Sequence, residues 1–357
     1  MKKLLLVISV ILGCISFVAC NNDDEFGKGE RFDKSASKNG LFICNEGNFQ
    51  YGNATLSYYD PESKEVENEI FYRANAMKLG DVVQSMTVRD KTGWVVVNNS
   101  HVVFAIDMNT FVEIGRITGV TSPYQIHFVS EEKAYITQLW SNRIAIVNPK
   151  RFEVTGYITC PGMETGTGST EQMVQYGKYV YVNCRSYQNS IVRIDTTTDR
   201  IVDELTVGVQ PTSLVLDCNN KLWTVTDGGY EGSPYGYEVP TLYRIDAESL
   251  TIEKEFKFNL GDYPSKLQLN GTKDRLYWIN NDIWQMDVTA ENVPVQPFLP
   301  CGYARYYGLT VSPHNGDVYV SDAVDYMQQG VVYRYSKEGK LVDQFYAGVI
   351  PGAFCWK

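Results

Sequence analysis

The sequence predicts an all-β fold, a seven-bladed β-propeller of four-stranded blades, on three observations. One pattern, a short apolar run that ends in a polar turn, returns seven times along the chain. The runs end at Asp60, Asp107, Asn148, Asp195, Asp246, Asp287 and Tyr335, at intervals of 41 to 51 residues. An apolar hairpin with Gly, Asn or Asp in its turn precedes most of them, as tight hairpins require. Repeats of about 40–50 residues with several short strands are typical of propeller blades.

The N-terminal 20 residues are predicted to be a lipoprotein signal peptide, because Lys2 and Lys3 precede an apolar stretch that ends in small residues before Cys20. Cys20 is the predicted lipidation site. Residues 21–38 lack apolar periodicity and are predicted to be a flexible tether. Their acidic start, residues 21–25, resembles the tract that sends lipoproteins of some Gram-negative anaerobes to the outer cell surface. An ordinary signal peptide and a merely solvated linker are the alternatives.

Residues 39–357 are predicted to form the propeller, and its inner strands are the clearest elements. Six inner hairpins are expected at 84–88 with 94–97, 125–129 with 133–137, 172–175 with 179–183, 213–216 with 222–226, 266–269 with 275–279, and 309–311 with 317–321. The first unit has no inner strand before Leu41. The end of the chain, Pro351–Trp356, matches the inner strand at 211–216, so it is predicted to complete the first blade. This closure removes the open edges of the array.

The charge, the apolar stretches and the cysteine spacing of the chain exclude some classes of partner. The chain has 32 basic and 42 acidic residues, and loss of Lys2 and Lys3 with the signal takes the formal charge from −10 to about −12. This charge disfavours nucleic acid and anionic membrane surfaces. No later stretch is long enough to span a bilayer, so the membrane is expected to be contacted only through the lipid anchor. The six cysteines after Cys20 show no C-x-x-C spacing and are predicted to be mostly free.

The long loops of a propeller gather on one face around its channel, and here they are rich in Tyr, Trp and Arg. Such side chains offer stiff contact area with polar tips, which favours a binding surface. The candidate ligand-binding residues are Phe49, Tyr51, Arg73, Gln84, Tyr124, Trp140, Arg185, Tyr187, Tyr230, Tyr235, Tyr237, Tyr263, Arg305, Tyr306 and Tyr326. The starts of the inner strands are expected to add Gln125, Gln172, Thr212, Lys266 and Tyr307. The alternative is that many of these aromatic residues pack between blades.

No catalytic residue and no metal ligand is predicted. The three histidines, His101, His127 and His314, have no spacing that groups them for a metal, and no G-x-S-x-G motif is present. A paired-carboxylate glycosidase stays open, because several carboxylates fall on the loop face. They are Glu164, Glu171, Asp227, Asp262, Asp322 and Asp325.

Residues 40–357 resemble the YncE-like, NHL/YVTN-type seven-bladed propellers. The matching signature is the segment 207–213 leading to 222–226, and it returns as 307–311 leading to 317–321. With the signal peptide and the acidic tract, the opening segment 41–49 looks like that of anaerobe surface-lipoprotein propellers, which include the BtuG-type cobalamin-binding proteins. That resemblance implies capture of a corrinoid at the cell surface and its delivery to a TonB-dependent outer-membrane transporter.

We therefore expect a monomeric, non-enzymatic outer-membrane lipoprotein that faces the cell surface and binds a ligand on its loop face. A corrinoid is the leading ligand, and no cofactor is expected. Two alternatives remain: a propeller lyase or lactonase, which would need a metal or a clustered constellation at the channel mouth, and an interaction module that caps a transporter. A carbohydrate, a siderophore or a partner protein would also suit the face.

Overall fold

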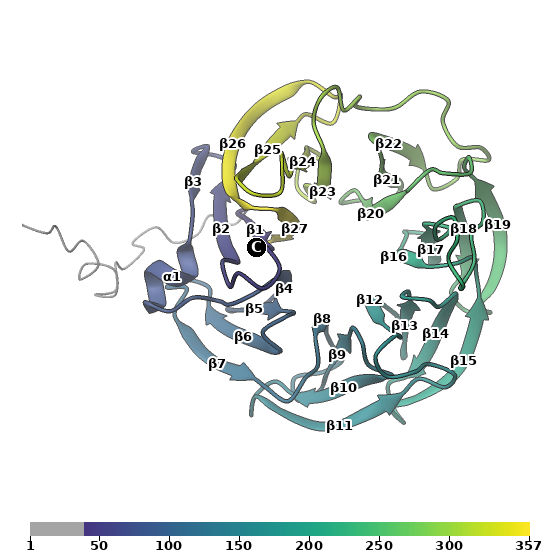
Figure 1. Cartoon of the computed structure of the whole chain (residues 1–357), viewed down its shortest axis with the longest axis horizontal. Helices are drawn as coiled ribbons and strands as arrows, with labels where there is room; N and C mark the ends of the chain where they lie inside the picture. Colours follow the sequence, from purple (N-terminus) through teal and green to yellow (C-terminus); the bar gives the residue numbers. More distant parts are fainter. Residues whose placement is uncertain (1–38) are drawn as a thin grey trace, which may run out of the picture.

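The structure is a computed structural model, and it describes residues 39–357. Seven antiparallel sheets stand around a central channel as the blades of a propeller (Figure 1). The predicted seven-bladed all-β fold is confirmed. The predicted signal peptide with Cys20 and the predicted tether lie outside the described residues.

The sheets follow one another along the chain, each running from the channel outwards. Blades two and three are β4 (Val83–Arg89), β5 (Thr92–Val97), β6 (Val102–Asp107) and β7 (Glu113–Ile117), then β8 (Pro123–Phe128), β9 (Ala134–Gln138), β10 (Arg143–Asn148) and β11 (Glu153–Thr159). Blades four and five are β12 (Thr170–Tyr176), β13 (Tyr179–Cys184), β14 (Ser190–Asp195) and β15 (Arg200–Thr206), then β16 (Pro211–Leu216), β17 (Lys221–Thr226), β18 (Thr241–Asp246) and β19 (Thr251–Lys257). Blade seven is β23 (Tyr306–Val311), β24 (Val318–Asp322), β25 (Gln329–Tyr335) and β26 (Leu341–Val349).

Blade one joins the two ends of the described chain. It consists of β27 (Pro351–Trp356), β1 (Leu41–Asn45), β2 (Thr55–Asp60) and β3 (Glu65–Glu67), in that order. The C-terminal β27 pairs antiparallel with β1, so that Leu41 lies opposite Trp356. Beyond this pair, the Lys357 N–H donates to the Gly40 carbonyl at 2.9 Å. The predicted closure of the ring by the C-terminal strand is confirmed.

Blade six departs from the four-stranded prediction. It has only β20 (Ser265–Leu269), β21 (Arg275–Asn280) and β22 (Asp282–Asp287). The segment after β22 makes a single bridge to the sheet, between Ile283 and Leu299. Pro294, Pro297 and Pro300 fall in this segment, and a proline has no N–H with which to continue a ladder. The outer position of this blade is therefore irregular.

A second irregular feature lies between blades one and two. There the helix α1 (Ile70–Asn75) follows β3 at the perimeter of the ring (Figure 1). Its Ile70 and Phe71 are buried in the core between these two blades. Among residues 39–357, no helix is long and apolar enough to cross a membrane.

The hydrophobic core is divided into seven clusters, which lie mostly between neighbouring blades. Trp94, Trp223 and Trp278 are buried in these clusters, as expected for tryptophans within strands. The six cysteines of the described residues are free, in agreement with the prediction. Apolar contacts between neighbouring sheets thus hold the ring together, and some loop residues such as Leu79 and Met163 also belong to the core.

The two faces of the ring differ. We call "mouth face" the face that carries the loops between second and third strands and those between blades, and "far face" the opposite one. On the far face, the last residue of the repeat closes its own turn. Asp107 Oδ1 accepts the N–H groups of Asn109 and Thr110 at 2.9 and 3.0 Å. The acidic residue of the repeat is therefore a turn former there.

Candidate functional site

The central channel holds a cavity of about 280 Å³ that is lined by residues of all seven inner strands. Its polar wall residues include Gln84, Tyr124, Gln125, Gln172 and Lys266. These side chains belong to the first three residues of their strands, which begin at the mouth face. The cavity therefore presents amide, phenol and ammonium groups near the mouth. Of the predicted inner-strand starts, Gln84, Gln125, Gln172 and Lys266 line it, whereas Thr212 and Tyr307 do not.

One side of the mouth carries an arginine between two carboxylates. Arg185 Nη1 lies 3.5 Å from Glu171 Oε1, and its Nη2 lies 3.2 Å from Asp227 Oδ2. Gln210 Nε2 donates to the other Asp227 oxygen at 3.0 Å. The Glu171 side chain is only 3% exposed, whereas that of Arg185 is 41% exposed. Burial raises the pKa of Glu171 above its ordinary value, although the Arg185 charge acts in the opposite direction.

The other side of the mouth carries a tyrosine between a carboxylate and an ammonium group. Tyr307 Oη donates to Glu46 Oε2 at 2.9 Å. Lys266 Nζ lies 5.4 Å from the centre of the Tyr307 ring and donates to the Gly352 carbonyl at 2.9 Å. Burial raises the pKa of Glu46, and the Lys266 charge opposes this rise. Burial and the nearby Glu46 hold the pKa of the Tyr307 phenol well above its usual range.

Two buried polar atoms at the mouth have no partner among residues 39–357. They are Glu171 Oε2 and Arg185 Nε. A buried polar atom without a hydrogen bond is costly, and native structures contain few of them. One buried acceptor and one buried donor are thus left without a hydrogen bond at the same point of the mouth. The arrangement suits a polar ligand that both donates and accepts hydrogen bonds.

A rim of exposed aromatic side chains surrounds this mouth. Within residues 39–357, nine of the eleven exposed aromatic residues lie on loops of the mouth face: Phe49, Tyr51, Trp140, Tyr230, Tyr235, Tyr237, Tyr263, Tyr303 and Tyr326. The other two, Tyr157 and Tyr346, lie on outer strands. Tyr187 stacks on Tyr235 with their ring centres 4.0 Å apart. The exposed aromatic residues of the loops thus lie mostly on the mouth face.

Three predicted site residues have other surroundings. Arg73 lies on α1 at the perimeter, where its Nη1 is 2.6 Å from Glu67 Oε2. Tyr306 packs against the apolar core between blades six and seven, because side chains alternate along a strand and its neighbour Tyr307 faces the channel. Arg305 is exposed; its backbone N–H donates to Asp322 Oδ1 at 3.0 Å, and its carbonyl accepts the Ala323 N–H at 3.2 Å.

Glu46 is the site residue that the sequence interpretation missed. Glu46 directly follows the buried β1. It lies in the loop between β1 and β2, which also carries the predicted aromatic residues Phe49 and Tyr51. A carboxylate at the end of an inner strand was the available signal. Its partners Lys266 and Tyr307 come from distant blades, so no local pattern in the sequence connects them.

The histidines are engaged elsewhere. His127 Nε2 lies 2.9 Å from Gln175 Oε1, and burial lowers the pKa of this imidazole. His101 Nδ1 accepts the Ser122 N–H at 2.9 Å. In the part of the chain that the structure describes, no three His, Cys, Asp or Glu side chains are grouped to hold a metal ion.

A family model described as a domain of unknown function, DUF5074, matches residues 39–346 of the chain. No curated protein matches the chain significantly. The chain is similar in structure to a quinonprotein alcohol dehydrogenase-like protein from Bacteroides thetaiotaomicron, with a TM-score of 0.66, 14% identity, and 91% of this chain and 79% of that one covered. It is also similar to the periplasmic gluconolactonase of Pseudomonas aeruginosa, with a TM-score of 0.66, 10% identity and coverages of 89% and 98%. Hydrazine synthase of Kuenenia stuttgartiensis has a TM-score of 0.56, 14% identity and coverages of 76% and 88%. At these identities the similarity shows the propeller fold alone.

Proposed function

The chain belongs to the DUF5074 family, and we propose that it is a non-enzymatic binding protein that captures a small organic ligand at the mouth of its channel. The observation that carries this proposal is the concentration of nine exposed aromatic residues around a polar mouth with unpartnered buried atoms. Aromatic side chains supply stacking surface at little cost in conformational entropy. The polar mouth supplies the hydrogen bonds that orient a ligand.

The leading ligand is a corrinoid. The channel cavity, at about 280 Å³, is smaller than the usual range for drug-sized ligands, so a large ligand must rest on the rim and send only one group into the channel. A corrin is a broad ring edged with amides. Its face suits the exposed rings of Trp140 and Tyr235, and its amides can hydrogen-bond to the polar groups of the mouth, among them the partly exposed Arg185 side chain.

The cellular setting follows from the N-terminal sequence and is part of the proposal. Lipidation at Cys20 would anchor the protein in the outer membrane, and the acidic start of residues 21–38 favours the cell surface. A ligand held there at the mouth would be passed to a TonB-dependent outer-membrane transporter. The protein is proposed to act as a monomer in this transfer.

Calorimetric titration of a protein comprising residues 21–357 with cyanocobalamin tests the ligand. We expect saturable one-to-one binding with a submicromolar dissociation constant. Absence of heat at about 100 µM cyanocobalamin, where even weak complexes form, would rule out the corrinoid. Titration with oligosaccharides and with iron-loaded siderophores would then test the other ligand classes on the same face.

A matched pair of variants assigns the binding to the mouth face. Tyr235→Ala removes one of the two stacked tyrosines of the rim, and we expect it to weaken binding by at least about tenfold. Tyr346→Ala removes an equally large exposed ring from the outer strand β26 and should leave the affinity unchanged. Equal losses in the two variants would contradict a site on the mouth face.

A further inference from the structure

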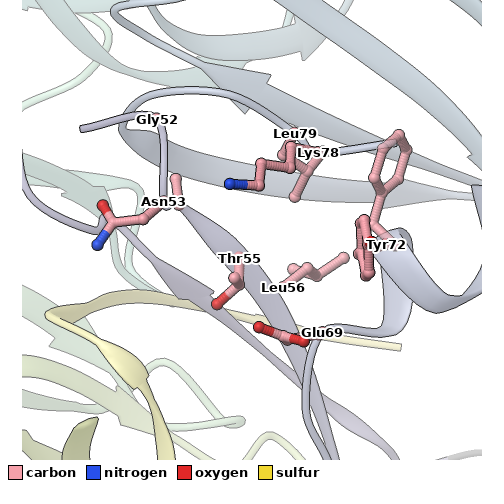
Figure 2. A pocket seen from close by; sticks show the side chains of 10 residues that line it. Gly52, Asn53, Thr55, Leu56, Glu69, Tyr72, Lys78 and Leu79 are labelled. Atoms are coloured by element: carbon pink, nitrogen blue, oxygen red, sulfur yellow. The ribbon is translucent and has the colours of Figure 1, made fainter. Parts of the chain in front are cut away.

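A second cavity, also of about 280 Å³, lies outside the channel, between the start of β2 and the helix α1. Figure 2 shows it from close by. Its lining residues come from three segments that meet between blades one and two. They are Gly52, Asn53, Ala54, Thr55, Leu56, Glu69, Phe71, Tyr72, Lys78 and Leu79. None of them lines the channel cavity, so the two cavities are separate.

The floor of this second cavity is apolar, and polar side chains line the rest of it. Leu56, Phe71 and Leu79 are buried members of the core cluster between blades one and two, and they form the floor. The Tyr72 side chain stands at the helix side of the cavity in Figure 2. The entrance near Gly52 is open, because a Cβ added there would meet no atom within 4 Å. An apolar group of a ligand can therefore reach the floor and be removed from water.

Two opposite charges stand at the edge of the same cavity. Lys78 and Glu69 lie on opposite sides of it, with the Leu56 side chain between them (Figure 2). Both side chains are exposed, and neither takes part in an ion pair with another residue of 39–357. They are also too far apart to pair with each other at 4.0 Å or less. The cavity thus offers one cationic and one anionic partner across an apolar floor.

We propose that this cavity binds a free α-amino acid with an apolar side chain, of the kind of leucine or phenylalanine. Lys78 pairs with the α-carboxylate, Glu69 pairs with the α-ammonium group, and the side chain lies on Leu56 and Leu79. The volume agrees with so small a ligand, since it falls just below the range of drug-sized sites. The two charges distinguish a free amino acid from the end of a peptide, which carries only one of them.

Saturation-transfer NMR with a protein comprising residues 21–357 tests this proposal, using L-leucine and L-phenylalanine as probes. We expect dissociation constants of about 0.1–10 mM, since exposed ion pairs add little to the burial of one side chain. N-acetyl-L-leucine lacks the ammonium group, L-leucinamide lacks the carboxylate, and glycine lacks the apolar side chain. N-acetyl-L-leucine and L-leucinamide should each bind about two- to fivefold more weakly than L-leucine. Glycine should bind at least about tenfold more weakly. Equal binding of the acetylated compound would overturn the proposal, as would no transfer from either amino acid at 10 mM.

A charge swap separates binding from an effect on folding. Lys78→Glu and Glu69→Lys should each weaken L-leucine binding. Each swap leaves two charges of the same sign at the cavity, so one end of the zwitterion meets a charge that repels it. The double variant Lys78→Glu/Glu69→Lys restores opposite charges, so the ligand can bind in the reversed orientation and affinity should return. Lys340→Glu, an exposed lysine of blade seven, is the matched control and should bind L-leucine normally. Failure of the folded double variant to regain affinity would overturn the assignment of the two charges.

Discussion

The far face and the mouth face are made by the same seven repeats, yet only one of them is regular. On the far face, Asp60, Asn148 and Asp195 each accept the N–H of the residue two positions on, at 2.8, 3.0 and 2.8 Å, as Asp107 does at 2.9 Å. On the mouth face, the loops differ in length and composition from blade to blade. Repetition in this chain therefore marks the scaffold, and departure from repetition marks the candidate site.

The mouth face also holds unusual backbone geometry. Left-handed backbone φ angles of 57°, 59°, 64° and 54° occur at Trp140, Tyr187, Tyr326 and Lys266. Residues other than glycine rarely adopt such angles. Such strain concentrates at binding and catalytic sites, where the surrounding structure holds it in place. On the far face, in contrast, the positive angles fall mostly in tight turns, where they are ordinary.

The largest loss of stability should come from removing the pair of β27 with β1, which closes the ring. Deletion of residues 351–357 removes β27, exposes the inner edge of β1 and leaves the core between blades seven, one and two open. We expect the cooperative unfolding transition to be lost altogether. Circular dichroism during thermal unfolding measures this, and a truncated protein with a sharp transition near that of the full protein would contradict it.

A smaller effect is expected at the mouth. Arg185→Gln leaves the buried Glu171 without its cation, which should lower the free energy of unfolding by about 2–3 kcal/mol at pH 7. The loss is smaller than for a fully buried ion pair, because the Arg185 side chain is partly exposed to water. Urea unfolding measures it. The double variant Arg185→Gln/Glu171→Gln removes the stranded charge and should recover most of the loss.

The pH dependence of this variant follows from the sign of the pKa shift. Burial raises the folded-state pKa of Glu171 above its ordinary value. Folding therefore favours the protonated form of Glu171. The resulting contribution to the free energy of unfolding is complete below the ordinary pKa, about 4.5, and is lost as the pH rises through the folded-state pKa. Without Arg185 the folded-state pKa should rise further, so the deficit of Arg185→Gln should be smaller at pH 5 than at pH 8. A deficit independent of pH would contradict this account.

A turn on the far face should tolerate one substitution and not another. Asp107→Ala removes the acceptor for the Asn109 and Thr110 N–H groups and should cost about 1 kcal/mol. Asp107→Asn should be nearly neutral, because Asn148 occupies the equivalent turn of blade three and accepts the Lys150 N–H. Neither should change ligand affinity at the mouth. Urea unfolding and calorimetry check the two expectations separately.

The smallest effect concerns the thiols. Cys218 lies exposed on a far-face turn, whereas Cys44, Cys160 and Cys184 are buried and have pKa values raised chiefly by that burial. A thiol reagent should therefore modify Cys218 rapidly and these three only after unfolding. Maleimide attached to Cys218 should leave affinity at the mouth unchanged. Rapid reaction of more than three thiols in the folded protein would contradict the burial of Cys44, Cys160 and Cys184.

The fold could be predicted because its signals are local and repeat. Most blades show their own hairpins and a turn-closing Asp or Asn in the sequence, and the match of residues 351–356 to an inner strand indicated the closure. The site could be predicted only in part. The starts of the inner strands pointed to Gln84 and Lys266, but the pairing of Glu46 with Tyr307 joins residues of blades one and seven. Such contacts depend on ring closure in space, which no local pattern contains.

The adjoining ends of the described chain have a consequence for how the molecule is orientated and divided. Gly40 and Lys357 are hydrogen-bonded at the far face, so the lipid anchor that we propose at Cys20 would join the ring at the face opposite the mouth. The same proximity means that the ring has no intrinsic first blade. A circular permutant that joins residue 357 to residue 39 and opens a far-face turn would keep every strand pair and move the two chain ends to another blade.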